Sequence, residues 1–200
     1  MKGRPCSSVM NLADRIRMIL TKPAEYFRHL RNESIVTAFL TYALFYFVFV
    51  TLTLIVSYFT QPVSLLFLKT LGIPVPMQHS YVMSIITTII SYFLTLIFSF
   101  IFVGILYLYV RIFGGKAGYA QTYNLWAYAQ MPTLLFGWIP VVSFFAGIWS
   151  LLLLIIGTSE VHQMSRMRAT LLYLIPLFFV FIVVAIVLTF ITYVFSTRFT

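Results

Sequence analysis

Three polar side chains recur on one side of a helix in the middle of an otherwise apolar sequence. Gln121, Asn124 and Tyr128 are spaced i, i+3 and i+7, which brings them onto one helical face. Pro132 follows one turn later, and because proline has no amide hydrogen, it leaves the carbonyl of Tyr128 for another helix, a water or a ligand. Such a row could line a path for a neutral substrate. It could equally join packed membrane helices, through hydrogen bonds of about 0.6 to 2 kcal/mol each, and polar membrane residues usually meet other helices first.

A carboxylate and an imidazole that could bind a metal ion or move protons stand two residues apart, at Glu160 and His162. At that spacing on a helix they point to different sides, and no third ligand lies nearby in the sequence. The alternative is a pair of surface groups that form salt bridges and contact lipid headgroups. We therefore expect no metal site and no cofactor.

The loop ahead of the polar row contains a group of glycines that make it flexible: Gly114, Gly115 and Gly118. Its lysine, Lys116, suggests a phosphate-binding loop, but Val110 stands where the first glycine should be and Ala117 replaces the serine or threonine. We interpret the loop as a hinge or as a contact with lipid headgroups. The GxGxxG, HExxH and GxSxG signatures are absent from the sequence. No catalytic residue is predicted, and the chain is not expected to be an enzyme.

Composition indicates that lipid is the solvent for most of this chain. Hydrophobic residues make up 62% and charged residues 8%, which leaves too little polar surface for a soluble globule of 200 residues. The net charge of +9 does not indicate nucleic acid, because the charges lie at the ends of apolar runs, as membrane anchors do. The single cysteine, Cys6, excludes an intramolecular disulfide and a cysteine-pair metal site.

The apolar runs predict five membrane-spanning helices. The first run would reach roughly 39 Å as a helix, against a hydrocarbon thickness of about 30 Å. Residues 60–80 contain several prolines and are expected to form a loop with a partly dipping turn or short helix. The uncharged stretch 119–159 needs a break, which Gly137 and Pro140 supply, although a single re-entrant dip would leave its two ends on the same side as well. The predicted spans are 34–59, 81–110, 119–136, 141–158 and 169–196.

Residues 1–33 form the extended hydrophilic part of the chain and are predicted to contain two amphipathic helices. In the first, apolar residues repeat at helical spacing from Val9 to Leu20, while charged residues take the other side. Pro23 suits the first turn of a second short helix that ends near Arg31. Helices of this kind lie on the membrane surface with their basic sides near anionic headgroups, and docking onto a partner is the alternative.

The fold class is therefore an all-α polytopic membrane helix bundle, with a single transmembrane domain at 34–200 behind the cytoplasmic segment 1–33. Of the thirteen Lys and Arg residues, all but Lys69 and Arg198 fall on the side of the amino terminus. The positive-inside rule then places the amino terminus in the cytoplasm and the carboxyl terminus outside. Six basic residues are candidates for contact with the cytoplasm or with anionic lipid: Arg15, Arg17, Arg28, Lys116, Arg166 and Arg168.

The fourth predicted span carries a pair of small residues, Ser143 and Gly147, four positions apart. Small residues at this spacing permit close approach of membrane helices. The approach could take place within one molecule or between copies, so a homo-oligomer is a plausible assembly.

Several short motifs in this frame resemble those of the Yip (Ypt-interacting protein) domain family. They are Pro23-Ala24-Glu25-Tyr26-Phe27, then Gly118-Tyr119 with Tyr123, Tyr128 and Pro132, then Trp149 to Gly157, and finally Arg168-Ala169. The resemblance covers about residues 20 to 195 and implies a five-span membrane protein with a cytosolic amino terminus. Eukaryotic members are associated with Rab-type small GTPases and with traffic between endoplasmic reticulum and Golgi. The chain resembles the short prokaryotic type, because the long cytosolic region and the Asp-Leu-Tyr-Gly-Pro motif are missing.

Two functions remain open. The first is a non-catalytic scaffold or adaptor in membrane organisation or trafficking, which contacts a protein partner or anionic lipid at the cytoplasmic face. The missing motif argues against a small GTPase as that partner, and nucleic acid is not expected. The second is a small carrier, pore or lipid-moving protein, although the lack of charge deep in the bilayer argues against proton coupling. The membrane would be the cell membrane of a prokaryote, or the endoplasmic reticulum or Golgi of a eukaryote.

Overall fold

The computed structural model describes residues 11–30, 33–70, 72 and 81–199, and within these ranges every regular element is an α-helix. The amino-terminal helices are α1 (Leu12–Thr21) and α2 (Pro23–His29). The remaining helices are α3 (Ile35–Thr70), α4 (Tyr81–Ile112), α5 (Tyr119–Ala129), α6 (Met131–Phe136), α7 (Pro140–Val161) and α8 (Arg166–Phe199). The expected all-helical class is confirmed.

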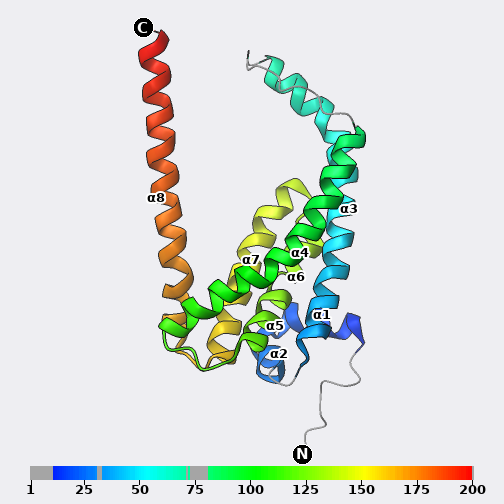
Figure 1. Ribbon diagram of the computed structural model, residues 1–200, viewed down its shortest axis with the longest axis vertical. Helices are drawn as coiled ribbons and strands as arrows, with labels where there is room; N and C mark the ends of the chain where they lie inside the picture. Colours follow the sequence, from blue (N-terminus) through cyan, green and yellow to red (C-terminus); the bar gives the residue numbers. More distant parts are fainter. Residues whose placement is uncertain (1–10, 31–32, 71, 73–80, 200) are drawn as a thin grey trace, which may run out of the picture.

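Four of these helices are long and apolar enough to cross a membrane. They contain the segments Ile35–Thr70, Val82–Ile112, Pro140–Val161 and Arg166–Thr192. The predicted third span is divided instead into α5 and α6, which are separated by Gln130. Figure 1 shows α5 and α6 beside α7, inside the lower half of the molecule. The chain therefore has four candidate membrane-spanning helices among its described residues, rather than the five that were expected.

The first long helix, α3, continues beyond the point where the sequence analysis ends it. It runs through Pro62 to Thr70, so the prediction of a loop was wrong as far as residue 70. Proline removes one backbone hydrogen bond, but the apolar residues that follow keep the chain helical. Figure 1 shows the upper part of α3 bent away from the axis of its lower part. The rest of the expected loop, residues 73–80, lies outside the described residues.

The core of the fold is built around α5. Residues Thr122 to Ala129 are all buried, and α5 packs against α3, α4 and α7. This helix is more polar than α3, α4 and α7, and polar groups cannot be left facing lipid. α5 can lie inside a membrane protein because the more apolar helices around it cover its polar groups.

The amino-terminal helices pack against the bundle. Ile19 of α1 and Tyr26 and Phe27 of α2 are buried, as is Leu30 directly after α2. α2 lies against α7, so the apolar side that was expected to contact lipid contacts protein. Val9, part of the same predicted apolar pattern, lies outside the described residues.

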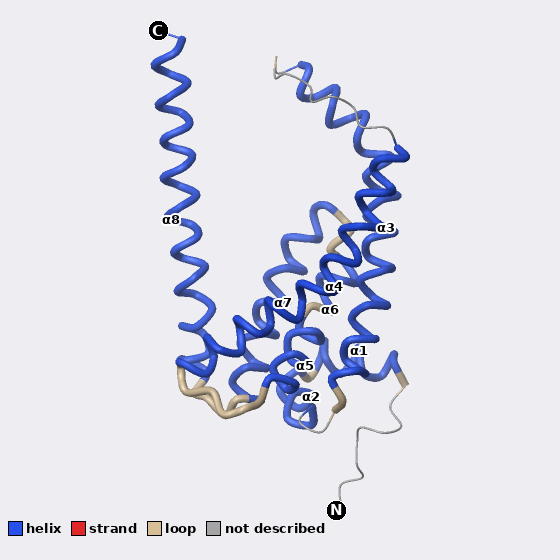
Figure 2. The backbone as a smooth tube through the Cα atoms, in the orientation of Figure 1, coloured by secondary structure: helices blue, strands red, loops and turns tan. Residues whose placement is uncertain are grey.

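The last helix, α8, stands apart from the others. Figures 1 and 2 show it meeting the bundle at its first turns and then diverging along the rest of its length. Leu172 is fully buried near its start, whereas the large apolar side chains from Leu174 to Ile191 are exposed. Figure 2 also shows the loop between α4 and α5 beside the turn between α7 and α8. These two loops are joined by the amide of Lys116, which donates to the carbonyl of His162 at 3.3 Å.

Candidate functional site

A hydrogen-bonded network links the amino-terminal helices to α5. The guanidinium of Arg15 donates to Glu33 Oε1 at 2.5 Å, and the hydroxyl of Tyr128 donates to the same oxygen at 2.7 Å. The side-chain amide of Asn124 donates to the backbone carbonyl of Glu33 at 2.7 Å. The side chains of Arg15 and Glu33 are 17% and 11% exposed, so water screens this ion pair weakly. We call Arg15, Glu33, Asn124 and Tyr128 the Glu33 network.

The charge on Glu33 changes the acidity of its partner. Burial by itself lowers the pKa of Arg15, but the charge of Glu33 and the hydrogen bond to it outweigh burial and raise that pKa. Arg15 therefore stays protonated. Its partner is held in place by Tyr128, which bonds to the carboxylate of Glu33, and by Asn124, which bonds to the backbone of Glu33. The Asn124 Oδ1 atom is buried and has no hydrogen-bond partner among the described residues.

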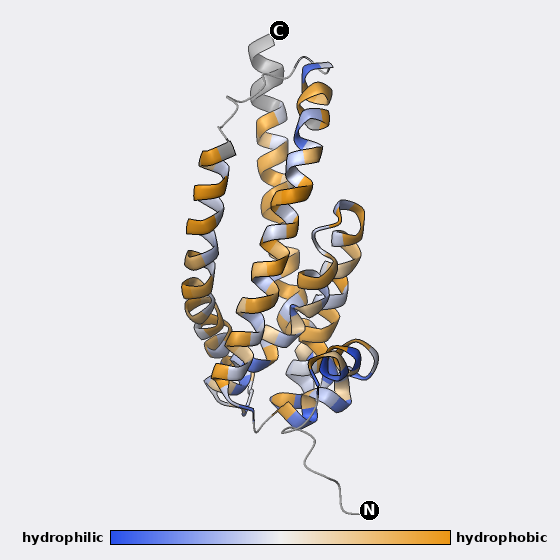
Figure 3. Cartoon of the chain, turned by 90° about the vertical axis from the view of Figure 1, so that its right-hand side faces the viewer, coloured by the Kyte–Doolittle hydropathy of each residue, from blue (hydrophilic) through white to orange (hydrophobic). Residues whose placement is uncertain are grey.

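A second ion pair joins α2 to α7. Arg28 donates to Glu160 twice, at 2.8 Å from Nε and 3.3 Å from Nη2. The side chain of Arg28 is 64% exposed, so this pair lies at the surface and is open to screening by salt. Figure 3 shows hydrophilic residues gathered at this end of the molecule, where α1 and α2 lie. We call it the polar end.

His162 lies beneath the loop that was predicted as a hinge. Its Nε2 atom is 3.2 Å from the hydroxyl of Thr122, which donates its own hydrogen to the carbonyl of Gly118. Nε2 must then carry the proton of the neutral ring, which leaves Nδ1 as a bare acceptor. Nδ1 is buried without a partner among the described residues and lies close to Gly115, where an added Cβ would approach it to 2.8 Å. Burial, helped by the positive charge of Arg111, lowers the pKa of His162 to about 4.

The structure separates the residues that the sequence placed on one polar row. Asn124 and Tyr128 both bond to Glu33, but Gln121 accepts from the amide of Gly118 at 3.0 Å and caps the start of α5. Pro132 occupies an early position of α6, so it starts a helix instead of interrupting one. The amide of Gln130 is directed at the carbonyls of Trp126 and Tyr128.

Glu160 and His162 also have separate surroundings. Glu160 pairs with Arg28 at the surface, whereas His162 is buried against Thr122. Within the part of the chain that the structure describes, no group of three or more His, Cys, Asp and Glu residues could hold a metal ion. Proton transfer between these two residues has no geometric support.

The six basic residues predicted to contact the cytoplasm or lipid fall into two groups. Arg15 and Arg28 are held in ion pairs. The other four have exposed side chains at the polar end: Arg17, Lys116, Arg166 and Arg168. The exposed group is the one that remains available to an outside partner.

The glycines have unequal roles. Gly114 adopts φ +89°, a backbone conformation that other residues rarely adopt, so the loop between α4 and α5 needs glycine there. At Gly147 an added Cβ would meet nothing within 4 Å, and Ser143 bonds to the carbonyl of Pro140 on its own helix. The close helix contact is instead at Gly157, where a Cβ would overlap Leu125 and approach the ring of Phe27 to 3.1 Å. Sequence reasoning missed Gly157 as a packing position.

Sequence reasoning also missed Glu33 and Thr122. Glu33 is a lone carboxylate at the start of the long uncharged run 34–68, and that isolation was a signal that it needs a partner. Thr122 gave no such signal, because a threonine in a membrane helix usually bonds to its own backbone.

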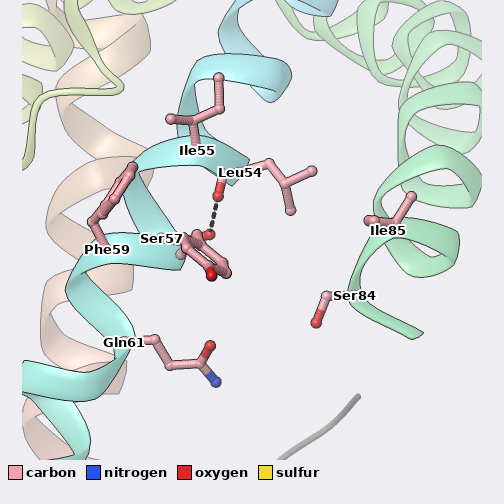
Figure 4. Close-up of a pocket in the computed structure, with 8 residues that line it drawn as sticks. Leu54, Ile55, Ser57, Phe59, Gln61, Ser84 and Ile85 are labelled. Atoms are coloured by element: carbon pink, nitrogen blue, oxygen red, sulfur yellow. Dashed lines mark hydrogen bonds between the residues drawn. The ribbon is translucent and has the colours of Figure 1, made fainter. Parts of the chain in front are cut away.

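A pocket of about 410 Å³ lies at the opposite end, between the bent part of α3 and the start of α4. Figure 4 shows Gln61 and Ser84 on opposite sides of it, with Ile55 and Ile85 above them. Its described lining residues carry no charge, and Ser57 donates to the carbonyl of Leu54 on its own helix. The pocket is remote from the Glu33 network and does not connect with it.

The fold and the site together define an all-helical integral membrane protein. Its polar residues are concentrated at one end, where hydrogen bonds and ion pairs join them. The Yip1 domain matches residues 17–188, so the chain belongs to the Yip1 domain family. The resemblance drawn from the sequence motifs is confirmed. No curated protein and no solved structure shows a significant match to the chain.

Proposed function

We propose that this protein is a non-catalytic scaffold or adaptor that presents the polar end to a protein partner or to anionic lipid. The observation that carries the proposal is the Glu33 network. It uses the polar side chains of α5 to fix the amino-terminal segment, and so builds a defined surface from α1, α2 and the loop between α4 and α5. Arg17 and Lys116 are exposed on that surface. A fixed surface with free basic residues suits recognition of an acidic partner.

The polar end faces the cytoplasm in this proposal. Basic residues are concentrated there, and cytoplasmic loops carry an excess of Lys and Arg. If α5 and α6 together serve as the third of five spans, the carboxyl terminus lies on the side of the membrane opposite to the polar end. The expected small GTPase partner of longer family members is not part of the proposal, because the motif associated with them is absent.

A carrier with a path along α5 has less support. Asn124 and Tyr128 are buried and donate to Glu33, so these donors are occupied within the protein. A substrate would have to displace Glu33 to reach them. That displacement would also remove the partner of Arg15.

Accessibility to a water-soluble thiol reagent distinguishes the two functions. Single cysteines would be placed at Gln121, Asn124 and Tyr128 in a Cys6→Ser background, and intact membranes would be labelled. The scaffold predicts protection at Asn124 and Tyr128 and reaction at a Lys116→Cys control. Labelling at both buried positions would overturn the scaffold and indicate a water-filled path.

A flux measurement provides the second arm. Liposomes that contain the protein should release trapped neutral solutes no faster than empty liposomes. Faster release that an Asn124→Leu substitution reduces would establish a path along α5 and contradict the proposal.

A further inference from the structure

A cleft separates α8 from the rest of the bundle where α8 leaves α7. Its volume is about 690 Å³, which falls in the range of about 300 to 1,000 Å³ that is usual for ligand sites. Leu106 of α4, Trp126 of α5 and Leu154 of α7 line one side, and Leu177 and Val180 of α8 line the other. Figure 1 shows how α8 diverges from these helices.

The cleft has a fixed base. Val110 and Leu172 belong to a buried cluster that joins the end of α4 to the start of α8. The hydroxyl groups of Tyr173 and Thr158 are 2.8 Å apart, which adds a polar link between α8 and α7. The position of α8 at its base is therefore set by packing, and the cleft above the base belongs to the fold.

The lining of the cleft suits a lipid chain better than another helix. None of the described residues that line it is Gly, Ala, Ser or Thr. Membrane helices associate where such small residues let their backbones approach, because lipid leaves no hydrophobic drive between them. Large branched and aromatic side chains hold a second helix away, but a flexible acyl chain can follow their irregular surface. Water is excluded as the occupant because the walls are almost entirely apolar.

One cation stands at the polar end of the cleft. Arg168 precedes Leu172, a lining residue, by four residues, so the two share a side of α8. The side chain of Arg168 is exposed. A guanidinium group binds phosphate well, and this one stands where an apolar wall meets the polar end.

We propose that the cleft between α8 and the α4–α7 wall is a binding site for one anionic phospholipid. An acyl chain fills the cleft, and the phosphate lies against Arg168. This inference goes beyond the proposed function, because it assigns a ligand to a site that the scaffold does not require. The lipid would fix α8 to the bundle above the base.

Photo-crosslinking tests the site in the full-length protein. Vesicles of phosphatidylcholine would contain a trace of phosphatidylglycerol with a diazirine in its acyl chain, and labelled peptides would be identified by mass spectrometry. We expect saturable labelling on both walls, in the peptides that contain Leu154 and Val180. Unlabelled phosphatidylglycerol should displace the label at lower concentration than phosphatidylcholine. Non-saturable labelling spread evenly around α8 would mean ordinary bulk lipid and would overturn the proposal.

Two tryptophan substitutions form a matched pair. Val180→Trp fills the cleft, whereas Phe178→Trp lies two residues earlier, roughly 200° around the same helix, at a position that does not line the cleft. We expect Val180→Trp to remove most of the saturable labelling and Phe178→Trp to leave it unchanged. Equal effects of the two substitutions would contradict a site in the cleft. A disulfide between copies that carry Leu177→Cys in the Cys6→Ser background would show that a second copy fills the cleft, and would also overturn the proposal.

The headgroup assignment has its own test. Arg168→Gln should weaken competition by phosphatidylglycerol about fivefold, the factor that corresponds to about 1 kcal/mol per basic residue at an anionic surface. Competition by phosphatidylcholine should change less, because its choline neutralises the charge of its phosphate. Arg17→Gln, on α1, is the control and should leave both unaffected. An unchanged affinity for phosphatidylglycerol in Arg168→Gln would refute the phosphate contact.

Discussion

The hydroxyl of Tyr128 donates to Glu33 Oε1 at 2.7 Å, and this bond connects the start of the first long helix with the end of α5. The same carboxylate oxygen accepts from Arg15 of α1. One carboxylate therefore holds three parts of the chain together. Because both charged side chains are largely buried, the loss of either leaves the other without its counter-charge.

Glu33→Gln should destabilise the protein more than substitutions of exposed charges do. The amide keeps the shape of the side chain but removes the charge that Arg15 and Tyr128 bond to, and hydrogen bonds to charged groups contribute about 1.5 to 3 kcal/mol. We expect a loss of that order in the free energy of unfolding, measured by titration with a denaturing detergent. Tyr128→Phe should cost less than Glu33→Gln, because Arg15 remains paired. Arg17→Gln serves as the exposed control, and an effect of Glu33→Gln no larger than this control would contradict the network.

The surface pair of Arg28 and Glu160 should behave differently from the Glu33 network. Arg28 is mostly exposed, so salt screens its attraction to Glu160. We expect Arg28→Gln to lower the stability less than Glu33→Gln, and the effect to disappear in high salt. Unfolding would be compared at low and high ionic strength for both variants. A salt-independent loss in Arg28→Gln would mean that the arginine acts through packing and not through its charge.

The helices and their order could be predicted largely from the sequence, because long uncharged runs in a chain of this composition have few alternatives to spanning a membrane. The periodicity placed Asn124 and Tyr128 on one side of a helix, and the structure gives them a common partner. The partner itself could not be predicted. Glu33 is 95 residues from Tyr128, and helical spacing carries no information about contacts at that distance.

Two features of the fold were misread for identifiable reasons. Pro62 was taken as part of a loop, since proline usually interrupts a helix, but the apolar residues on both sides keep α3 helical and the cost is a bend. The pair of small residues at Ser143 and Gly147 was selected by its spacing alone. Spacing does not show which face of α7 meets another helix, and the face that does so carries Gly157.

Two substitutions in α7, Gly157→Ala and Gly147→Ala, compare a glycine that lies in a close helix contact with a glycine that does not. A Cβ at residue 157 would overlap Leu125 and crowd Phe27, whereas a Cβ at residue 147 meets nothing within 4 Å. We expect Gly157→Ala to lower the free energy of unfolding by about 1 to 3 kcal/mol, the usual cost of overpacking a core. Gly147→Ala should not lower it, because alanine favours the helix. Equal losses would mean that Gly147 is covered by something else, such as a second copy of the chain.

The stability of the protein should decrease as the pH falls below about 6.5. The pKa of His162 is lowered to about 4 in the folded state, because the ring is buried and Arg111 is nearby. An unfolded chain has a histidine pKa of about 6.5. Between these values the unfolded state binds a proton that the folded state does not, so stability is full above pH 6.5 and falls as the pH approaches 4.

Substitution of the histidine checks this dependence. His162→Gln keeps an amide that can donate to Thr122 but cannot be protonated, so the slope of stability against pH should flatten between pH 6.5 and 4, by up to about 1.4 kcal/mol per pH unit. His29→Gln, which changes an exposed histidine on α2, should keep the wild-type slope. Unfolding would be measured in the same detergent at each pH. If the slope persists in His162→Gln, the proton is taken up elsewhere, and the buried position of His162 has no consequence for stability.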